Sequence, residues 1–150
     1  TPKPSSAASD VYKRQYEYQF DMNDIDEIVR IYHGNHWNGH NQEEVITLFN
    51  TATHVVIAKR EGQVIGFARA MSDGVFNAAI YDVVVDTAYQ SKGVGNKIVQ
   101  EMVNYLGELS CIHLIATTGN ESFYEAIGFR KLKTGMAIYN NAKLKDEYTV

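Results

Sequence analysis

The chain has 150 residues with a formal net charge of −4, and hydrophobic and charged residues make up 45% and 21% of it. These values are typical of one soluble globular domain. The negative charge argues against sequence-independent binding of nucleic-acid backbones, which needs clustered lysine and arginine, and no apolar run approaches the roughly 18 residues of a membrane span. Cys111 is the single cysteine, which excludes an intramolecular disulfide and a cysteine zinc site. With no pattern typical of a secretory signal, we expect a cytoplasmic protein.

The first fifteen residues differ from the rest of the chain. They are polar, contain both prolines and show neither helical nor strand periodicity. Within them, Asp10–Gln15 match the translation of a transposon-end adaptor used in sequencing. We therefore interpret residues 1–15 as a disordered, non-native extension and residues 16–150 as a single domain.

Two helices are predicted before the main sheet. A short alternating strand over 16–20 leads into a helix that ends near Gly34, because isoleucine and valine recur there at helical spacing. Asn41 with Glu44 three residues later forms a capping pair, which predicts the start of a second helix.

Three strands are predicted next, over 54–60, 64–71 and 77–86. The turn residues Glu61–Gly62 and Ser72–Gly74 separate them, and such short connections are typical of hairpins. The pattern therefore predicts an antiparallel meander.

The remaining elements return to helical periodicity. An amphipathic helix over 93–106 precedes a strand over 112–118, which predicts a parallel crossover. A short helix over 120–127 ends at Gly128, and alternation over 129–140 predicts terminal strand material. The whole is an α/β (α+β) fold with a mixed, mostly antiparallel sheet and helices on both faces.

The segment Gln90–Gly95 stands between a buried strand and that long helix. A glycine within a helix lowers stability by about 1 kcal/mol relative to alanine. The presence of Gly93 and Gly95 at the start of this helix therefore calls for an explanation. Amides without side chains can approach a pyrophosphate at the positive end of a helix, and Lys92 adds charge nearby. A loose first turn explains the glycines equally well. The spacing fits neither a P-loop nor a dinucleotide fold.

Two motifs together resemble a family. Gln90-Ser91-Lys92-Gly93-Val94-Gly95 matches the Gln/Arg-x-x-Gly-x-Gly/Ala signature of the GNAT N-acetyltransferases, and the later run from Asn120 through Phe123-Tyr124 to Gly128-Phe129 is similar to their second signature. The resemblance covers about Tyr16–Tyr139 and implies the three-layer GNAT fold. Similarity to the serotonin N-acetyltransferase-like branch comes from the segments 65–70, 72–73, 76–78 and 82–83.

The resemblance implies an enzyme that moves the acetyl group of acetyl-CoA onto the primary amine of a small molecule by direct attack in a ternary complex. Acetylation of a protein amino terminus or lysine is the alternative. A non-catalytic acyl-CoA-binding module is an alternative of another class. We expect no nucleic-acid, membrane or metal partner, and a homodimer is compatible with the family.

The same resemblance assigns coenzyme residues. Backbone groups of Val83 and Val85 would meet the pantetheine arm where the sheet splays, and an amide there would stabilise the thioester oxygen. Asn120 would bind the arm or cap the following helix. The implied set is Val83, Val84, Val85, Gln90, Ser91, Lys92, Gly93, Val94, Gly95, Asn96, Asn120 and Phe123.

Catalytic roles follow in the same way. Tyr124 corresponds to the family tyrosine that protonates the departing thiolate, although packing beside Phe123 is its alternative role. The amine must lose a proton before attack, and plant relatives carry an aspartate where this chain has Thr117. We therefore choose Asp82 as the general base, with a hydrogen-bonded structural carboxylate as its alternative.

The acceptor site is expected near the polar loop after the first helix. Trp37 is predicted to be an aromatic wall of this site and Arg69 a residue that reaches it, although a plain salt bridge would also explain Arg69. The histidines of the loop, His33, His36 and His40, are interrupted by glycines and have no cysteine nearby, which argues against a metal site.

Overall fold

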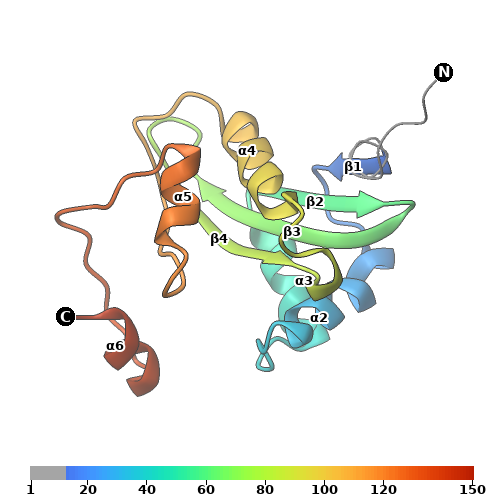
Figure 1. Cartoon of the computed structure of the whole chain (residues 1–150), viewed down its shortest axis with the longest axis horizontal. Coiled ribbons are helices and arrows are strands. Elements are labelled where there is room, and N and C mark those ends of the chain that lie inside the picture. Colours follow the sequence, from blue (N-terminus) through green and yellow to red (C-terminus); the bar gives the residue numbers. More distant parts are fainter. Residues whose placement is uncertain (1–12) are drawn as a thin grey trace. The chain divides into compact units, whose positions relative to one another are not determined.

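The computed structural model describes residues 13–150, so the prediction for residues 1–12 lies outside the described residues. Contacts divide the chain into two compact units, one ending at Leu114 and the other spanning Ile115–Val150 (Figure 1). Within residues 13–150, none of the helices is both long enough and apolar enough to cross a membrane.

The first unit contains a five-stranded mixed sheet with the order β1-β2-β3-β4-β5. The first four strands are antiparallel and β5 is parallel to β4, as the meander and the crossover predicted. The strands are β1 (Arg14–Glu17), β2 (His54–Arg60), β3 (Gln63–Ser72), β4 (Asn77–Val85) and β5 (Cys111–His113).

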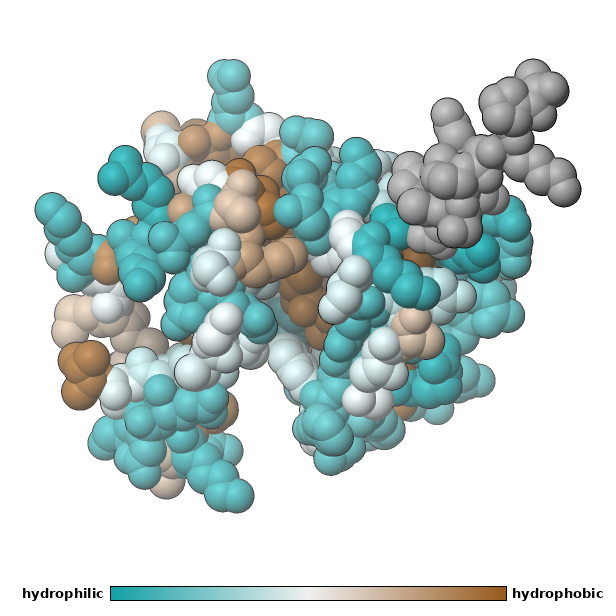
Figure 2. Space-filling view, in the orientation of Figure 1, coloured by the Kyte–Doolittle hydropathy of each residue, from teal (hydrophilic) through white to brown (hydrophobic). Residues whose placement is uncertain are grey.

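Helices cover both faces of this sheet (Figure 1). Helices α2 (Ile25–Gly34) and α3 (Gln42–Thr51) pack on one face, and α4 (Val94–Leu106) packs on the other, where it contacts β2, β3 and β4. Apolar residues of α2 and α3 form the core with the sheet, and their outward faces are mostly hydrophilic, as the lower right of Figure 2 shows. The fold class predicted from the sequence is confirmed.

Local signals explain where these helices begin and end. The Asn41 side chain accepts a hydrogen bond from the Glu44 amide at 2.9 Å, which is the predicted cap of α3. Helix α4 ends at Gly107, whose φ of 79° suits glycine. Short 3-10 turns, η1 (Met22–Asp24) and η2 (Thr87–Tyr89), precede α2 and α4.

Helix α4 lies unusually close to β3 at Gly66. A Cβ atom at this position would lie 2.9 Å from Ile98 Cδ1 and 3.0 Å from the Val84 carbonyl oxygen. Both distances are too short for ordinary contact, so only glycine fits here without a shift of the helix or of β4.

The start of the sheet differs from the prediction. Strand β1 begins at Arg14 and ends at Glu17, whereas alternation predicted residues 16–20. Arg14 and Gln15, which we assigned to the extension, pair with Arg60 and Lys59 of β2. The edge of β2 offers backbone partners whatever the polarity of the side chains, so a polar segment can pair with it.

The predicted terminal strand over 129–140 is wrong. The described residues contain no strand there, and the side chains of Met136 and Ile138 are 97% and 94% exposed. Alternation signals a strand only where a neighbouring strand completes the hydrogen-bond ladder. The strand predicted over 112–118 is likewise limited to Cys111–His113.

The second unit contains two short helices. Helix α5 (Glu121–Ile127) was predicted, and Gly128 ends it with a φ of 114°. Helix α6 (Ala142–Tyr148) was not predicted, although Asn141 accepts hydrogen bonds from the amides of Lys143 and Leu144 as an N-cap does.

Candidate active site

The glycine-rich segment forms a left-handed turn before α4. Ser91 and Gly93 have φ values of 63° and 80°, and α4 begins at Val94. Successive amides in such a turn, at the positive end of a 13-residue helix, form a concave anion site. The turn can therefore present backbone N–H groups to a phosphate.

Charge around this turn favours an anion as well. The first turn of α4 has no acidic residue. The Lys92 ammonium lies 5.5 Å from the centre of the Tyr89 ring, and Arg14 donates a hydrogen bond to the Lys92 carbonyl at 2.8 Å. Lys92 thus places a cationic side chain at the segment predicted to hold a pyrophosphate, whereas Arg14 belongs to the stretch interpreted as non-native.

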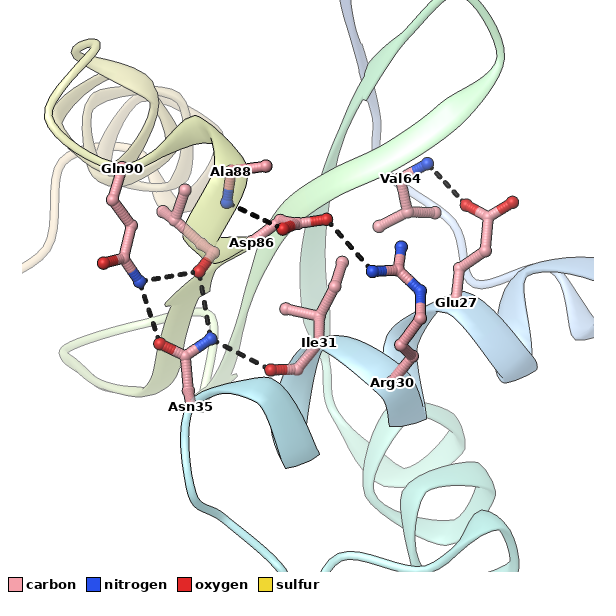
Figure 3. Close-up of polar contacts among 9 residues, drawn as sticks. Glu27, Arg30, Ile31, Asn35, Val64, Asp86, Ala88 and Gln90 are labelled. Carbon is pink, nitrogen blue, oxygen red and sulfur yellow. Dashed lines mark hydrogen bonds and ion pairs between the residues drawn. The ribbon is translucent and has the colours of Figure 1, made fainter.

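Hydrogen bonds hold the turn from its other side (Figure 3). Asp86 caps η2 by accepting from the Ala88 amide at 3.0 Å and pairs with Arg30 of α2 at 3.3 Å. The Gln90 side chain donates to Asn35 Oδ1 at 2.9 Å and to the Val85 carbonyl at 3.0 Å. Because the Gln90 side chain already makes these two hydrogen bonds, we expect the coenzyme to contact this residue through its backbone.

Other predicted coenzyme residues also have side chains committed to the fold. Val84 and Val94 are buried, and Asn96 accepts a hydrogen bond from Gln100 one turn later in α4. Val84 and Val94 can therefore offer a ligand only their backbone, whereas Asn96 also has its Nδ2 donor. Their role in binding stays a prediction.

The free edge of β4 adjoins this turn. Strand β4 pairs with β5 only over Asn77–Ala79, so residues 80–85 have no partner strand on that side among the described residues. This is the splayed sheet predicted to receive the pantetheine arm at Val83 and Val85. The Val85 carbonyl already accepts hydrogen bonds from Asn35 and Gln90. We therefore expect the pantetheine arm to contact the other backbone groups of Val83 and Val85.

Asp82 lies at an irregularity in β4 and has a φ of 55°. Its Oδ2 accepts from Arg69 Nε at 2.6 Å and from the Tyr32 hydroxyl at 2.9 Å. The side chains of Arg69 and Asp82 are only 15% and 10% exposed. The salt bridge considered for Arg69 is therefore present, and it joins the two residues predicted for the acceptor side and for the base.

Tyr32 is the functional candidate that sequence reasoning missed. Burial and the negative charge of Asp82 raise the pKa of its phenol, so it remains a hydrogen-bond donor. Its ring stacks on His40 at 4.5 Å and lies 5.7 Å from Trp37. A tyrosine on the buried face of a helix needs a hydrogen-bond partner for its hydroxyl. The helical pattern around Tyr32 could therefore have indicated that this side chain contacts a polar group.

The loop histidines make local contacts. A ring nitrogen of His33 lies 2.8 Å from the His40 carbonyl oxygen. Among residues 13–150, no group of histidine, cysteine, aspartate and glutamate side chains is arranged to hold a metal ion.

In the second unit, Asn120 does not cap α5 with its side chain. Its Nδ2 instead donates to Thr117 Oγ1 at 2.6 Å. The capping role predicted as one of two alternatives is therefore wrong, because the backbone of Asn120, with φ −102° and ψ 6°, lacks the extended conformation usual for a capping residue. Contact with the coenzyme stays a prediction for this residue.

Tyr124 occupies the middle of α5 and is half-buried. Edge-on contacts join its ring to Phe123 at 4.9 Å and to Phe129 at 5.8 Å, so the predicted packing beside Phe123 is present. Burial raises the pKa of the Tyr124 phenol, which keeps its proton in place. A protonated phenol can donate to a sulfur anion.

Comparison with known proteins decides the family. The acetyltransferase (GNAT) family model matches residues 22–129. The chain belongs to the acetyltransferase (GNAT) family. The GNAT signatures at Gln90–Gly95 and Asn120–Phe129 led to the same family from sequence alone. A GNAT-family acetyltransferase from Streptococcus pneumoniae shares the fold, with a TM-score of 0.72, 21% identity and coverage of 86% of this chain and 98% of that one.

Curated GNAT relatives differ in the acceptor that their names give. Serotonin N-acetyltransferase 2, chloroplastic, of Oryza sativa subsp. japonica is 39% identical over 85 residues, 53% of this chain and 42% of that protein. Histone acetyltransferase TAP1 of Glycine max is 35% identical over 79 residues, 51% of this chain and 34% of that protein. The matched stretches span 28 to 55% of the lengths of the curated relatives, so the acceptor has to be argued from the site itself.

Proposed function

We propose that this GNAT acetyltransferase moves the acetyl group of acetyl-CoA onto the primary amine of a small molecule within a ternary complex. The observation that carries the proposal is the left-handed turn at Ser91–Gly93, which opens α4 beside the free edge of β4. Members of the family generally use acetyl-CoA, and a turn of free amides next to unpaired strand backbone suits its pyrophosphate and its amide-containing arm.

The residues of the turn fit the coenzyme. Nothing lies within 4 Å of a Cβ built on Gly93, so the space in front of its backbone is open. Amides from Ser91 to Gly95 would hold the pyrophosphate, and Lys92 would add a positive charge. Val83 would offer backbone groups to the pantetheine arm along the free edge.

Starting from an alkylammonium, the reaction requires two protons to leave the nitrogen, one before attack and one to solvent after the C–N bond forms, and one proton to reach the sulfur. An alkylammonium has a pKa near 10, so a base must take its proton before attack. Asp82 would accept that proton through Oδ1, since Arg69 and Tyr32 both occupy Oδ2. The amine nitrogen then bonds to the acetyl carbon, the carbon–sulfur bond breaks, and Tyr124 donates to the thiolate.

The acceptor side supports a small amine. The carboxylate of Asp82 lies beside the Tyr32 hydroxyl, and the rings of Trp37 and His40 pack around Tyr32. Arg69 already pairs with Oδ2 of this carboxylate, so an organic ammonium ion would meet its Oδ1. Acetylation of a protein amine is the second candidate, favoured by the relative named as a histone acetyltransferase.

Thiol release from acetyl-CoA tests the proposal. The chain is assayed against aryl amines, polyamines, aminoglycosides and lysine-containing peptides, with acetyl-CoA binding measured in parallel by calorimetry. Release that depends on a small amine supports the proposal. Release with peptides alone favours the protein acceptor, and tight binding without release from any amine favours a non-catalytic module. Absence of acetyl-CoA binding would overturn the assignment of the turn.

A further inference from the structure

Asn35, the residue that follows α2, joins three parts of the first unit. Its backbone amide donates to the carbonyls of Ile31 and Tyr32, which closes the last turn of α2. Its side-chain Nδ2 donates to the same Ile31 carbonyl at 2.9 Å and to the Val85 carbonyl at 3.0 Å. Asn35 therefore ties the end of α2 to the last residue of β4.

The remaining oxygen of the same side chain reaches the glycine-rich turn. Asn35 Oδ1 accepts from Gln90 Nε2 at 2.9 Å, and the same nitrogen lies 3.0 Å from the Val85 carbonyl (Figure 3). The two amide side chains thus converge on one carbonyl, and each also bonds the other. The closed arrangement uses both the donor and the acceptor of Asn35.

The position of this arrangement gives it a consequence for the turn. Gln90 directly precedes Ser91 and Gly93, whose left-handed backbone directs the amides, and Val85 ends the free edge of β4. Asp86 at the start of this segment is tied to Ile65 and Arg30, but Gln90 at its end is exposed, and the short 3-10 turn η2 between them adds little support. Without a cross-link to α2, the turn would sample more conformations before a ligand binds.

We propose that Asn35 is a positioning residue for coenzyme binding, which acts through Gln90 and the Val85 carbonyl to hold the Ser91–Gly95 turn in its binding conformation. This inference rests on the proposed use of acetyl-CoA at that turn. It adds the residue that follows α2 to a pyrophosphate site whose other proposed residues lie in the turn between β4 and α4. Asn35 contacts the turn without contacting the reacting atoms, so its effect is on affinity.

The test compares Asn35→Ala with Asn41→Ala. Asn41 caps α3 through the Glu44 amide and has no contact with the turn, so its substitution measures the cost of losing a structural asparagine in the same unit. We expect Asn35→Ala to raise the Kd and the KM for acetyl-CoA about tenfold, which corresponds to about 1.4 kcal/mol. Its kcat at saturating acetyl-CoA should stay within about twofold of the parent. Asn41→Ala should lower the Tm and leave the Kd unchanged.

Gln90→Ala gives a second route to the same question. Gln90 is exposed, so this variant should fold even if Asn35→Ala does not. It should weaken acetyl-CoA binding to a similar extent, and the double variant should be little worse than either single one, because residues that act as a unit are not additive. Asn35→Asp keeps an oxygen that accepts from Gln90 but places a carboxylate oxygen opposite the Ile31 and Val85 carbonyls, so its Kd should be no lower than that of Asn35→Ala.

Several results would overturn the inference. An unchanged Kd in Asn35→Ala, equal losses in Asn35→Ala and Asn41→Ala, or additive losses in the double variant would each remove the positioning role while leaving acetyl-CoA binding by the parent intact. Failure of the parent chain to bind acetyl-CoA would overturn the proposed function and this inference together, so the two failures are distinguishable.

Discussion

The two signature regions of this GNAT-family chain both have a glycine with a positive φ at a helix end, but different contacts hold the two regions in place. Gly93 directly precedes α4 and Gly128 directly follows α5, and both adopt positive φ values, 80° and 114°. The turn before α4 is tied to α2 by Asn35 and Arg30, residues far from it in sequence. Beside α5, Asn120 bonds Thr117 three residues away, and Thr118 bonds Glu147 of α6 within the same unit. Matching a signature therefore does not imply equal structural support.

Burial follows the same division. The buried residues of α4 form a continuous stripe along the helix. In the second unit, Ile115–Val150, no residue is fully buried. A segment without buried apolar contacts opens at low free-energy cost. The first region is therefore suited to holding a ligand in fixed geometry, and the second to contributing a side chain.

Substitution of Gly93 should give the largest effect on the first region. Valine at this position would be forced into a left-handed conformation, which costs about 1 to 2 kcal/mol, and its side chain would fill the space proposed for the pyrophosphate. We expect Gly93→Val to weaken acetyl-CoA binding at least about 200-fold in calorimetry. Gly62→Val is the matched control, since Gly62 has a φ of 79° in the turn between β2 and β3. Equal loss in both variants would contradict a specific role for Gly93.

Tyr124→Phe should affect the chemistry without affecting the coenzyme. Removal of the hydroxyl removes the proposed acid, and such losses lower kcat by about 100-fold. The Kd for acetyl-CoA should stay at the parent value, since the ring contacts with Phe123 and Phe129 remain possible. Tyr148→Phe removes a hydroxyl from the same unit and serves as the control. Unchanged turnover in Tyr124→Phe would assign this tyrosine to packing alone.

Asp82→Asn should lower kcat by a smaller factor, about thirtyfold, because water can replace part of a base's role. Tyr32→Phe removes one donor to the same carboxylate and should change kcat by less than about threefold. Steady-state kinetics with a saturating amine separates the two. Asp73→Asn, in the turn between β3 and β4, is the matched control, since its carboxylate accepts only local amides. Parent-like kcat in Asp82→Asn would leave Asp82 a structural carboxylate.

The smallest expected effect concerns the support of α4 by Tyr18. Its hydroxyl donates to Glu101 at 2.6 Å, which raises the pKa of Tyr18 to about 12 and lowers the pKa of Glu101. The contribution to stability should therefore be complete between about pH 5 and pH 10. It should fade as the pH rises from 10 through 12, and also as the pH falls below the ordinary glutamate pKa.

Tyr18→Phe tests this contribution. The loss at pH 7 should be about 0.5 kcal/mol or less, because solvent screens an exposed pair. Denaturant unfolding at pH 7 and pH 11 measures it, and the difference between parent and variant should shrink at pH 11. A difference that is equal at both pH values would contradict the role of the hydrogen bond.

Elements with strong local patterns were predictable from sequence. The strands of the meander and the amphipathic helix α4 begin and end within about two residues of their predicted bounds, and helix α3 begins where its capping pair predicted, as expected for long periodic segments. Each pattern reflects one face buried against a neighbour, which the chain encodes locally. Helix α6 carried a local signal as well, the cap at Asn141, and was overlooked.

What sequence could not show depends on distant pairs. Tyr32 meets Asp82 across 50 residues, and Asn35 meets Gln90 across 55, so no spacing rule connects them. The terminal strand failed for a related reason. Residues 129–140 alternate as a strand does, but a strand also requires a partner, and partnership is not a local property.

The close contact at Gly66 sets the separation between two layers of the fold. Ile98 belongs to the second turn of α4, so the depth at which it rests on β3 determines how high the start of that rigid helix stands above the sheet. At this point Gly66 has a hydrogen atom where any other residue would have a Cβ atom. The height of the first amides of α4 above the open edge of β4 therefore depends on the glycine at position 66.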